Sequence, residues 1–503
     1  MALYDTRIPD RYVQENTFLG QPREEVPLPT FEEARPLLPQ PFWANHPAVI
    51  DSYWGAWKAA FGNLRQPSAA NGFVSNYIDT AFNGCLFMWD SVFILFFGRY
   101  GRRAFDFQRT LDNFYAKQHK DGYICREIDE ANGEERFERY DPPSTGPNVM
   151  PWSEWEHYIN LGDRERLARV FPALLAYYHW YRTYRAWPDG TYFAAGWIAM
   201  DNQPRFPPDS NTLEHQWWSH GHMSWIDTTC QAIVAARQLV SMAEVLGRRA
   251  EVADLEQEAE ALSRFVNAHL WDEAQGYYFD RWRDGQLNGC KSVAAFWALL
   301  AGIVPPERLP RLVAHLCNPA EFDRPHRVPT LSADNPIYNP EGEYWRGSVW
   351  ASTNYMILRG LTQVGEEALA HEIGRNHTEM VAEVYRQTGI LWENYAPERA
   401  ARGNHSKANY VGWTGLPPIT VLFEYVFGLR PDVPEGRLLW DVRLLEEHGV
   451  QQYPYGVDGL LELHCAGRGS QSEEPAITAK GNVPVEVVVK WQGGSKTIKV
   501  RRY

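Results

Sequence analysis

Apolar residues recur at every third or fourth position along most of the chain, which is the spacing of one face of an α-helix. The pattern is clearest across residues 232–246 and 252–266, and Gly247 predicts the end of the first of these two helices. Because long alternating runs are nearly absent from this part of the chain, we expect an all-α main domain. The same periodicity predicts further helices near 51–62, 91–118, 151–185, 291–303, 347–363, 366–388 and 415–428.

The two ends of the chain have different patterns. The first 45 residues are rich in proline and charge, which is typical of an extended arm lying on a body. Near the C-terminus, alternating runs at 483–491 and 496–500 flank a pair of glycines and predict a β-hairpin. The patterns therefore predict an extended N-terminal arm at 1–45, a helical body at 46–430 and a small β-sandwich-like C-terminal domain at 431–503.

Short aromatic turns recur between the predicted helices. They read Lys-Asp-Gly-Tyr at 120–123, Pro-Asp-Gly-Thr-Tyr-Phe at 188–193 and Gly-Tyr-Tyr-Phe-Asp at 276–280. Recurring turns of one kind indicate a repeated helical hairpin, and a ring of such hairpins is a toroid. In a toroid, residues that are far apart in the sequence share one central cavity.

Composition and charge narrow the class of ligand. Aromatic residues make up 14% of the chain, with 21 Trp and 26 Tyr. Their rings stack on the flat C–H face of a pyranose while their polar edges bind hydroxyl groups. The 49 Lys and Arg against 63 Asp and Glu give a formal charge of −14, which disfavours nucleic acid, anionic membranes and polyanionic substrates. A neutral, small-molecule carbohydrate fits both observations.

The cysteine and histidine spacings argue against metal and disulfide chemistry. The six cysteines include no C-x-x-C pair, so neither a zinc ribbon nor a disulfide framework is predicted. His371 and His377 are six residues apart, whereas a helical zinc-protease motif needs four. We expect no metal and no cofactor. Reduced thiols, and the absence of an apolar run of signal or membrane length, predict a cytoplasmic protein.

Two carboxylates are candidates for acid–base chemistry. Asp201 follows an apolar run and precedes Pro204, which bars a regular helix and suits a carboxyl group at the rim of a pocket. Desolvation there would raise its pKa and keep it protonated as a general acid, whereas the alternative role for Asp201 is to cap a turn. Glu393, flanked by Trp392 and Tyr395, is the candidate general base.

Glycoside hydrolysis needs such a pair of carboxyl groups. An inverting enzyme separates them by about 6.5–9.5 Å so that a water molecule fits opposite the leaving group. Asp201 and Glu393 are almost 200 residues apart in the sequence, so they meet this requirement only if the chain closes on itself. A helical toroid provides that closure.

Tryptophans around a charged residue form a second candidate cluster. Trp345 and Trp350 would shape the walls of a sugar subsite, while Arg346 between them binds sugar hydroxyls or a carboxylate. The alternative is that Arg346 only stacks on the indoles inside a rigid loop. Trp392 and Trp413 lie in similar aromatic blocks and are further candidates for binding the substrate.

Six blocks follow one another within roughly residues 45–428. In this order they resemble glycoside hydrolase family 63 and its bacterial relatives, the mannosylglycerate and glucosylglycerate hydrolases, and more distantly the trehalases. The blocks are Phe-Met-Trp-Asp-Ser-Val-Phe at 87–93, Tyr-Asp-Pro-Pro at 140–143, Met-Asp-Asn-Gln-Pro-Arg at 200–205, Tyr-Trp-Arg-Gly-Ser-Val-Trp at 344–350, Glu-Asn-Tyr-Ala-Pro-Glu at 393–398 and Gly-Trp-Thr at 412–414.

The resemblance implies an (α/α)6 barrel and inversion at the anomeric carbon. It assigns the acid to Asp201 and the base to Glu393. The subsite that holds the cleaved sugar is then lined by Trp89, Asp90, Trp345 and Arg346. Each of these roles is an expectation that comes from the resemblance.

The chain departs from the family pattern at two places. It has Asp-Pro-Pro at 141–143 where the family commonly has Gln-Pro-Pro, and Gln-Pro-Arg at 203–205 where the family has Ser-Pro-Arg. These departures leave the sugar and the leaving-group subsite open, and Gln203 is counted among the candidate binding residues. Asp90 has an alternative role as the N-cap of a helix beside Ser91.

The predicted function is an exo-acting, inverting α-glycoside hydrolase, with a small α-glucoside or oligosaccharide as the default substrate. A sugar epimerase that uses His220 or His222 is one alternative, because α-toroids also host that chemistry. A non-catalytic sugar-binding protein is another. The hydrolase alone requires Asp201 and Glu393 across one cavity. The N-terminal arm and the β-rich appendage are places where a homo-oligomer would make its contacts.

Overall fold

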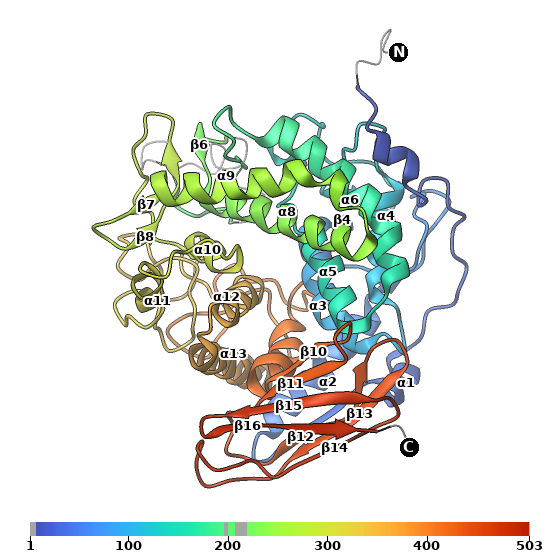
Figure 1. Cartoon of the computed structure of the whole chain (residues 1–503), viewed down its shortest axis with the longest axis vertical. Coiled ribbons are helices and arrows are strands. Elements are labelled where there is room, and N and C mark those ends of the chain that lie inside the picture. The colour runs from blue at the N-terminus through green and yellow to red at the C-terminus, as the bar shows by residue number, and fades with distance from the viewer. Residues whose placement is uncertain (1–6, 196–199, 207–218, 502–503) are drawn as a thin grey trace.

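The computed structural model describes residues 7–195, 200–206 and 219–501 (Figure 1). A mainly helical body is followed by a β-rich C-terminal part, as the sequence predicts. Figure 1 shows the helices arranged around a centre, with the β-rich part packed against one side. Among the described residues, no helix is long and apolar enough to cross a membrane.

Helices from six successive parts of the described chain form an inner ring. Each of them packs on the next, and the last packs on the first. Aromatic side chains fill the space between them: Trp152 lies parallel to Tyr355 with ring centroids 5.8 Å apart, and Trp297 lies 6.0 Å from Trp152. The ring consists of α3 (Met88–Gly98), α5 (Met150–Leu161), α8 (Ile226–Leu246), α10 (Trp297–Leu300), α12 (Ala351–Gln363) and the π-helical segment η9 (Leu416–Val426).

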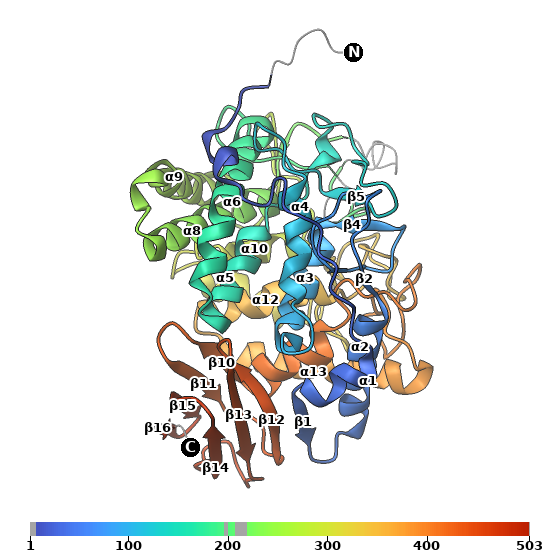
Figure 2. The same cartoon turned by 90° about the vertical axis from the view of Figure 1, so that its right-hand side faces the viewer.

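Further helices pack outside this ring. The helix α6 packs on α5 and α8, α9 packs on α8, and α13 packs on α12, η9 and α2. Their bounds are α1 (Phe31–Ala34), α2 (Pro47–Gly62), α4 (Asp112–Ala116), α6 (Arg164–Arg185), α9 (Ala253–His269), α11 (Leu309–Leu316) and α13 (Glu367–Thr388). Figure 2 shows α5 and α6 side by side in the view turned by 90°.

Two predicted helices are interrupted in the structure. The stretch predicted at 151–185 divides into α5 and α6 because Gly162 adopts a left-handed conformation with φ of 71°. The stretch predicted at 91–118 ends as α3 at Gly98, where an added Cβ would lie 2.6 Å from the Cβ of Phe107. The chain then continues through two 3₁₀ turns, η3 (Arg99–Gly101) and η4 (Phe107–Leu111), into α4.

The C-terminal part contains two four-stranded sheets, ordered β1-β12-β13-β14 and β10-β11-β15-β16. The predicted hairpin at the C-terminus is confirmed, because β15 and β16 pair antiparallel from Val485–Val500 to Trp491–Gly494. The longer strands are β1 (Gln40–Trp43), β10 (Leu429–Asp432), β11 (Arg437–Asp441), β12 (His448–Tyr455), β13 (Gly459–Cys465), β14 (Ile477–Gly481), β15 (Val485–Trp491) and β16 (Gly494–Val500).

The N-terminal segment packs along the helical body and then enters the β-rich part. Phe18 is fully buried, and the Asn16 side-chain amide donates a 2.9 Å hydrogen bond to the carbonyl oxygen of Tyr115. Strand β1 pairs antiparallel with β12, so this segment supplies an edge strand to the C-terminal sheet. The chain ends that flank the helical body therefore meet in one sheet.

Short strands of two or three residues pair with one another in the loops of the helical body. Of these, β4 and β5 pair beside the start of α3 and bring Phe87 next to Glu127. The short strands are β2 (Leu64–Arg65), β3 (Tyr77–Ile78), β4 (Cys85–Phe87), β5 (Glu127–Asp129), β6 (Met223–Ser224), β7 (Trp271–Asp272), β8 (Tyr277–Tyr278) and β9 (Arg281–Trp282).

Candidate active site

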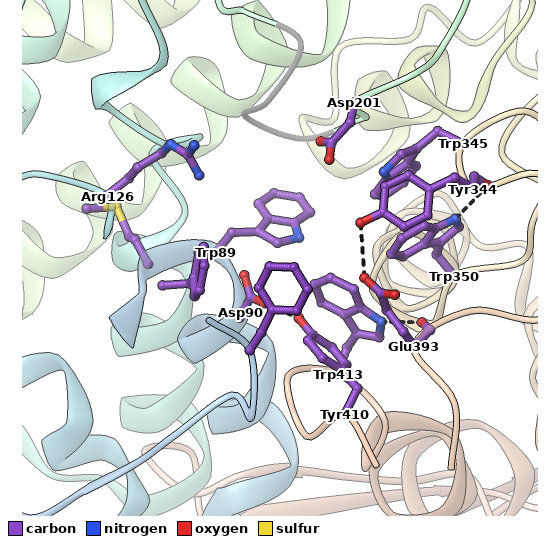
Figure 3. Close-up of a pocket in the computed structure, with 14 residues that line it drawn as sticks. Trp89, Asp90, Arg126, Asp201, Tyr344, Trp345, Trp350, Glu393, Tyr410 and Trp413 are labelled. Carbon is purple, nitrogen blue, oxygen red and sulfur yellow. Dashed lines mark hydrogen bonds between the residues drawn. The ribbon is translucent and has the colours of Figure 1, made fainter. Parts of the chain in front are cut away.

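A cavity opens where the inner helices begin (Figure 3). Trp89 and Asp90 lie in the first turn of α3, and Trp350 directly precedes α12. The cavity volume is about 100 Å³, so by itself it is smaller than the roughly 300–1,000 Å³ that is usual for small-molecule sites. The lining residues are Phe82, Phe87, Met88, Trp89, Asp90, Arg126, Gly146, Asp201, Tyr344, Trp345, Trp350, Glu393, Tyr410 and Trp413.

Asp201 faces the cavity from a turn at residues 200–206. Burial raises the pKa of its carboxyl group to about 7; the Arg126 cation opposes this shift and the Asp90 carboxylate adds to it. The next residue, Asn202, accepts a 2.8 Å hydrogen bond from the backbone amide of Trp345 through its side-chain oxygen. The loop that carries Asp201 is thereby attached to the loop that carries Trp345.

Glu393 lies across the cavity from Asp201 in Figure 3 and is only 4% exposed. Burial raises the pKa of its carboxyl group to about 7. The backbone amide of Lys407 donates to one carboxylate oxygen at 3.0 Å, and the Tyr344 hydroxyl donates to the other at 3.1 Å. Both hydrogen bonds favour the ionised form of Glu393, in opposition to burial.

Residues in the left-handed backbone region gather in the loops around the cavity. This conformation is costly for a residue with a side chain and persists only where the surrounding structure holds it. Tyr344 has φ of 58°, and in this conformation its side-chain hydroxyl reaches the carboxylate of Glu393. The other such residues in these loops are Ala81, Asn83, His405 and Asn409.

Asp90 is part of the cavity floor and does not cap α3. The helix begins at Met88 with Phe87 in the capping position, so the N-cap role is wrong. Tyr410 donates its hydroxyl hydrogen to Asp90, which is 9% exposed. Burial raises the pKa of Asp90 to about 6, and the hydrogen bond from Tyr410 opposes that shift.

Indoles form the walls of the cavity. Trp345 and Trp350 stack with centroids 4.0 Å apart and ring planes 7° from parallel. The Trp413 indole donates a 2.7 Å hydrogen bond to the backbone carbonyl of Glu393, so this wall also fixes the segment that carries the carboxylate. The buried Trp89 indole N–H has no hydrogen-bond partner among the described residues and is available to a ligand hydroxyl.

A wider cavity of about 650 Å³ adjoins the first and shares both carboxylates with it. Arg346 lines this outer space and is held by a 3.0 Å hydrogen bond from its Nε to the carbonyl oxygen of Asn202. Lys407 lines it too, with its ammonium 4.5 Å from the centre of the Phe82 ring. Because Asp201 and Glu393 border both spaces, a bond held between them joins an inner group to an outer group.

The structure brings together Asp201, Glu393 and six of the eight predicted binding residues. Two others line neither cavity. Gln203 is buried beneath the loop and donates a 3.1 Å hydrogen bond to the carbonyl oxygen of Thr330. The Trp392 indole donates to the hydroxyl of Thr388 at the end of α13, on the outer side of its strand-like segment. The six that line the inner or the outer cavity are Trp89, Asp90, Trp345, Arg346, Trp350 and Trp413.

The two histidines considered for an epimerase also lie outside both cavities. His220 and His222 have ring centroids 4.6 Å apart, and His220 packs on Trp187. The neighbouring Trp217 and Trp218 lie outside the described residues. In the described part of the chain, no group of three or more His, Cys, Asp or Glu is arranged to hold a metal ion.

Sequence reasoning does not identify three polar residues that line the cavity. Tyr344 belongs to one of the family-like blocks, but its contact with Glu393 depends on a backbone conformation that no pattern signals. Arg126 belongs to no motif, and it reaches the cavity because its Nε is held 2.6 Å from the carbonyl oxygen of Pro143. Tyr410 is marked only by its proximity to Gly-Trp-Thr in the sequence.

The mannosylglycerate hydrolase MGH1-like glycoside hydrolase domain matches residues 86–414, which is well over half of the chain. The chain belongs to this family of glycoside hydrolases, and the resemblance to glycoside hydrolase family 63 is confirmed. A relative from Schizosaccharomyces pombe, described as a probable mannosyl-oligosaccharide glucosidase, is 28% identical over 285 residues. That match covers 50% of this chain and 34% of the yeast protein.

Two solved structures share the fold. The glycoside hydrolase family 63 mannosylglycerate hydrolase from Thermus thermophilus, solved with glucose, has a TM-score of 0.57 at 21% identity and covers 72% of this chain and 98% of its own. The neutral trehalase from Saccharomyces cerevisiae has a TM-score of 0.51 at 14% identity and covers 69% of this chain and 73% of its own. The more distant resemblance to trehalases is thereby confirmed at the level of fold.

Proposed function

We propose that the protein is an exo-acting, inverting α-glycoside hydrolase with Asp201 as general acid and Glu393 as general base. The observation that carries this proposal is that the two carboxyl groups, each with a raised pKa, border one aromatic cavity. The ring of inner helices is the inner layer of an (α/α)6 barrel in this proposal, with the active site at the N-terminal ends of its helices.

The environments of the two groups support this division of roles. Each has a pKa raised to about 7, mainly by burial, and the like charge of Asp201 is a further cause of the raised pKa of Glu393. Glu393 accepts hydrogen bonds from Lys407 and Tyr344 that stabilise its carboxylate, whereas no side chain among the described residues donates to Asp201. When the pair loses its first proton, Glu393 is therefore the group that ionises and Asp201 keeps its proton.

The proposed reaction follows from that protonation state. Asp201 gives its proton to the glycosidic oxygen while the bond from this oxygen to the anomeric carbon breaks. On the opposite face, Glu393 takes a proton from a water molecule whose oxygen forms the new bond to the anomeric carbon. The products are a sugar with inverted anomeric configuration and the free alcohol of the leaving group, with each carboxyl group left in the opposite protonation state.

The cavity shape supports cleavage at the end of a substrate. The sugar that is released occupies the inner space, where Trp345 and Trp350 form a wall and Asp90 accepts hydrogen bonds from its hydroxyl groups. The leaving group occupies the outer space beside Arg346 and Lys407. We propose an α-glucoside because the yeast relative is described as a glucosidase and the Thermus structure holds glucose.

Anomer-resolved proton NMR tests the proposal directly. The protein is incubated with a panel of α-glucosides and α-mannosides that includes trehalose and glycosylglycerates. We expect the first released sugar to be the β-anomer, and the Asp201→Asn and Glu393→Gln variants to lose about 10²–10⁴-fold in kcat/KM. Initial α-anomer would contradict inversion, and full activity in either variant would remove that residue from its role.

We also propose that the protein works in the cytoplasm. All six cysteines are unpaired thiols, and five of them are buried. Unpaired cysteines in this number are usual in a reducing compartment, whereas oxidising compartments favour disulfides. Alkylation of the protein in intact cells before lysis, followed by mass spectrometry, checks the thiol state, and disulfide-linked peptides would contradict this location.

A further inference from the structure

A buried ion cluster lies beneath the loop that carries Asp201. The guanidinium of Arg205 donates two hydrogen bonds to the two carboxylate oxygens of Asp227, at 3.1 and 2.6 Å. Its Nε donates to the side-chain oxygen of Gln203 at 3.2 Å and lies 3.6 Å from a carboxylate oxygen of Asp280. The Trp225 ring lies against the guanidinium, 4.4 Å from its central carbon.

Arg205 does not line either cavity, and its side chain is 3% exposed. A planar guanidinium that meets a carboxylate through two parallel N–H groups is fixed in both distance and orientation. Because its donors are directed at protein acceptors, Arg205 is not a residue that binds the substrate. The cluster instead fixes the position of the backbone from which its arginine projects.

Both carboxylates of the cluster are attached to one helix. Asp227 is the second residue of α8, one of the helices of the inner ring, and Asp280 accepts a 2.9 Å hydrogen bond from the backbone amide of Ile226, the first residue of α8. Carboxylates at the N-terminal end of a helix are stabilised by its unpaired amides and by its dipole. The side-chain amide of Asn288 donates to Asp280 at 2.9 Å and completes this anchor.

We propose that Arg205, together with Asp227 and Asp280, is the positioning device that holds the general acid Asp201 at the glycosidic oxygen. This inference rests on the proposed function. No side chain among the described residues donates a hydrogen bond to Asp201, so the place of its carboxyl group depends on the backbone of residues 200–206. That backbone is attached to the neighbouring loop through Asn202 and to α8 through Arg205.

Loss of Arg205 has a kinetic signature that general damage to the fold does not share. A displacement of about 1 Å in a catalytic group costs on the order of 10²-fold in rate. Only substrates whose leaving group must be protonated depend on the acid. An α-glucosyl fluoride releases fluoride, which leaves without a proton from the enzyme, so it needs the base and the sugar subsite but not a well-placed Asp201.

The experiment compares kcat/KM for the alkyl α-glucoside that the protein cleaves best with kcat/KM for α-glucosyl fluoride. For Arg205→Met we expect a loss of about 10²-fold with the glucoside and less than about 10-fold with the fluoride. Arg205→Lys keeps the charge but loses the two parallel N–H groups, and we expect an intermediate loss with the same selectivity. Equal losses on both substrates, or no loss on either, would overturn the inference.

Arg166 offers a matched control away from the cavity. It is also a mostly buried arginine, with hydrogen bonds of 2.8 and 2.7 Å to the two carboxylate oxygens of Glu154 and one of 3.0 Å to Asp112. For Arg166→Met we expect a lower midpoint of unfolding and the same fold-change on both substrates. A selective loss on the glucoside in this variant would also contradict the inference, because selectivity would then follow from any buried arginine.

The failure of the positioning role is distinguishable from the failure of the proposed function. If Asp201→Asn loses the glucoside activity but retains fluoride hydrolysis, Asp201 is the acid, and the Arg205 variants then test the positioning role alone. If Asp201→Asn is fully active on both substrates, the acid assignment itself fails. If Asp201→Asn is selective and Arg205→Met is not, only the positioning role is overturned.

Discussion

Two groups of buried carboxylates lie at the two ends of the ring of inner helices, and they differ in the charges that surround them. In the C-terminal halves of the helices, Glu424 of η9 contacts Arg99, the residue that follows α3, and accepts hydrogen bonds from Tyr100 at 2.8 Å and Tyr355 at 3.1 Å. Glu156 of α5 contacts Arg359 and lies 3.6 Å from Arg99. Two arginines therefore balance two carboxylates, and we name these four residues the balanced cluster.

At the N-terminal ends of the inner helices, the buried carboxyl groups outnumber the cations that line the same cavity. Asp90, Asp201 and Glu393 line one cavity together with a single cationic residue, Arg126. Burial raises the pKa of all three carboxyl groups. Both groups of carboxylates are buried, but the balanced cluster has two arginines for two carboxylates, whereas the cavity has one arginine for three. Burial without a matching cation is the condition that raises the pKa of a carboxyl group toward neutral pH.

The largest effect on stability is expected when one carboxylate of the balanced cluster is removed. Glu424→Gln removes the closer carboxylate of the buried Arg99 and leaves it only Glu156 at 3.6 Å, and loss of one member of a buried pair costs about 3–5 kcal/mol. Urea unfolding of the purified variant measures this loss in the free energy of unfolding. Since Glu424 does not line the cavity, kcat/KM of the folded fraction should stay within a few-fold of wild type. A stability change below 1 kcal/mol would show that the cluster is not a structural charge balance.

In the cavity, by contrast, removal of a carboxyl group is expected to increase the free energy of unfolding. The pKa of Glu393 is about 7 in the folded protein and about 4.3 in an unfolded chain, so its ionisation opposes folding. This penalty is absent below pH 4, grows as the pH rises and is complete above pH 7. We therefore expect Glu393→Gln to be more stable than wild type by about 1–3 kcal/mol at pH 8 and equally stable at pH 4. Equal stabilities of wild type and Glu393→Gln at pH 8 would contradict this prediction, because they would mean that neighbouring groups offset the cost of burying the Glu393 charge.

A smaller effect is expected from the loss of one hydrogen bond to Glu393. Tyr344→Phe removes the hydroxyl that donates to Glu393 and so removes a contact that favours the carboxylate. The pKa of Glu393, the proposed general base, should rise by about 1 unit, which moves the acidic limb of the kcat/KM profile to higher pH. The profile is measured across pH 4–9 with the best α-glucoside. A limb that stays in place would show that the Tyr344 hydroxyl does not act through Glu393.

The helical body and both catalytic candidates follow from patterns in the sequence. Helical periodicity is local, so both α8 and α9 are predicted, and α8 ends at Leu246 as Gly247 indicates. However, α8 begins at Ile226, six residues before the predicted pattern. Asp201 and Glu393 stand out because each lies in a dense aromatic block, and their presence in one cavity agrees with the prediction that the chain closes on itself. The balanced cluster is not predicted, since Glu156 and Glu424 lie in helical stretches where an acidic residue is ordinarily on the solvent side.

The remaining details depend on long-range contacts. Gln203 belongs to a family-like block, yet its side chain turns under the loop to Thr330, and only the packing of that second loop decides this. Trp392 precedes the base, and since successive side chains of an extended segment point to opposite sides, it faces away from the cavity. Arg205 stands in the same block as Asp201, but its partners Asp227 and Asp280 come from other parts of the chain.

The smallest expected effect tests the order in which the two carboxyl groups of the proposed catalytic pair ionise. Asp201 is one of the charges that raise the pKa of Glu393, and it ranks below burial as a cause. This like-charge effect acts only while Asp201 is ionised, and in the proposed order of ionisation Asp201 still holds its proton when Glu393 loses its own. We therefore expect Asp201→Asn to leave the acidic limb of the profile within about half a unit of wild type. Because the glucoside reaction needs Asp201, the profile is measured with α-glucosyl fluoride, for wild type and Asp201→Asn in parallel. A limb that moves to lower pH by more than about half a unit would mean that Asp201 is already ionised when Glu393 titrates, which would contradict the assignment of Glu393 as the first to ionise from its hydrogen bonds to Lys407 and Tyr344.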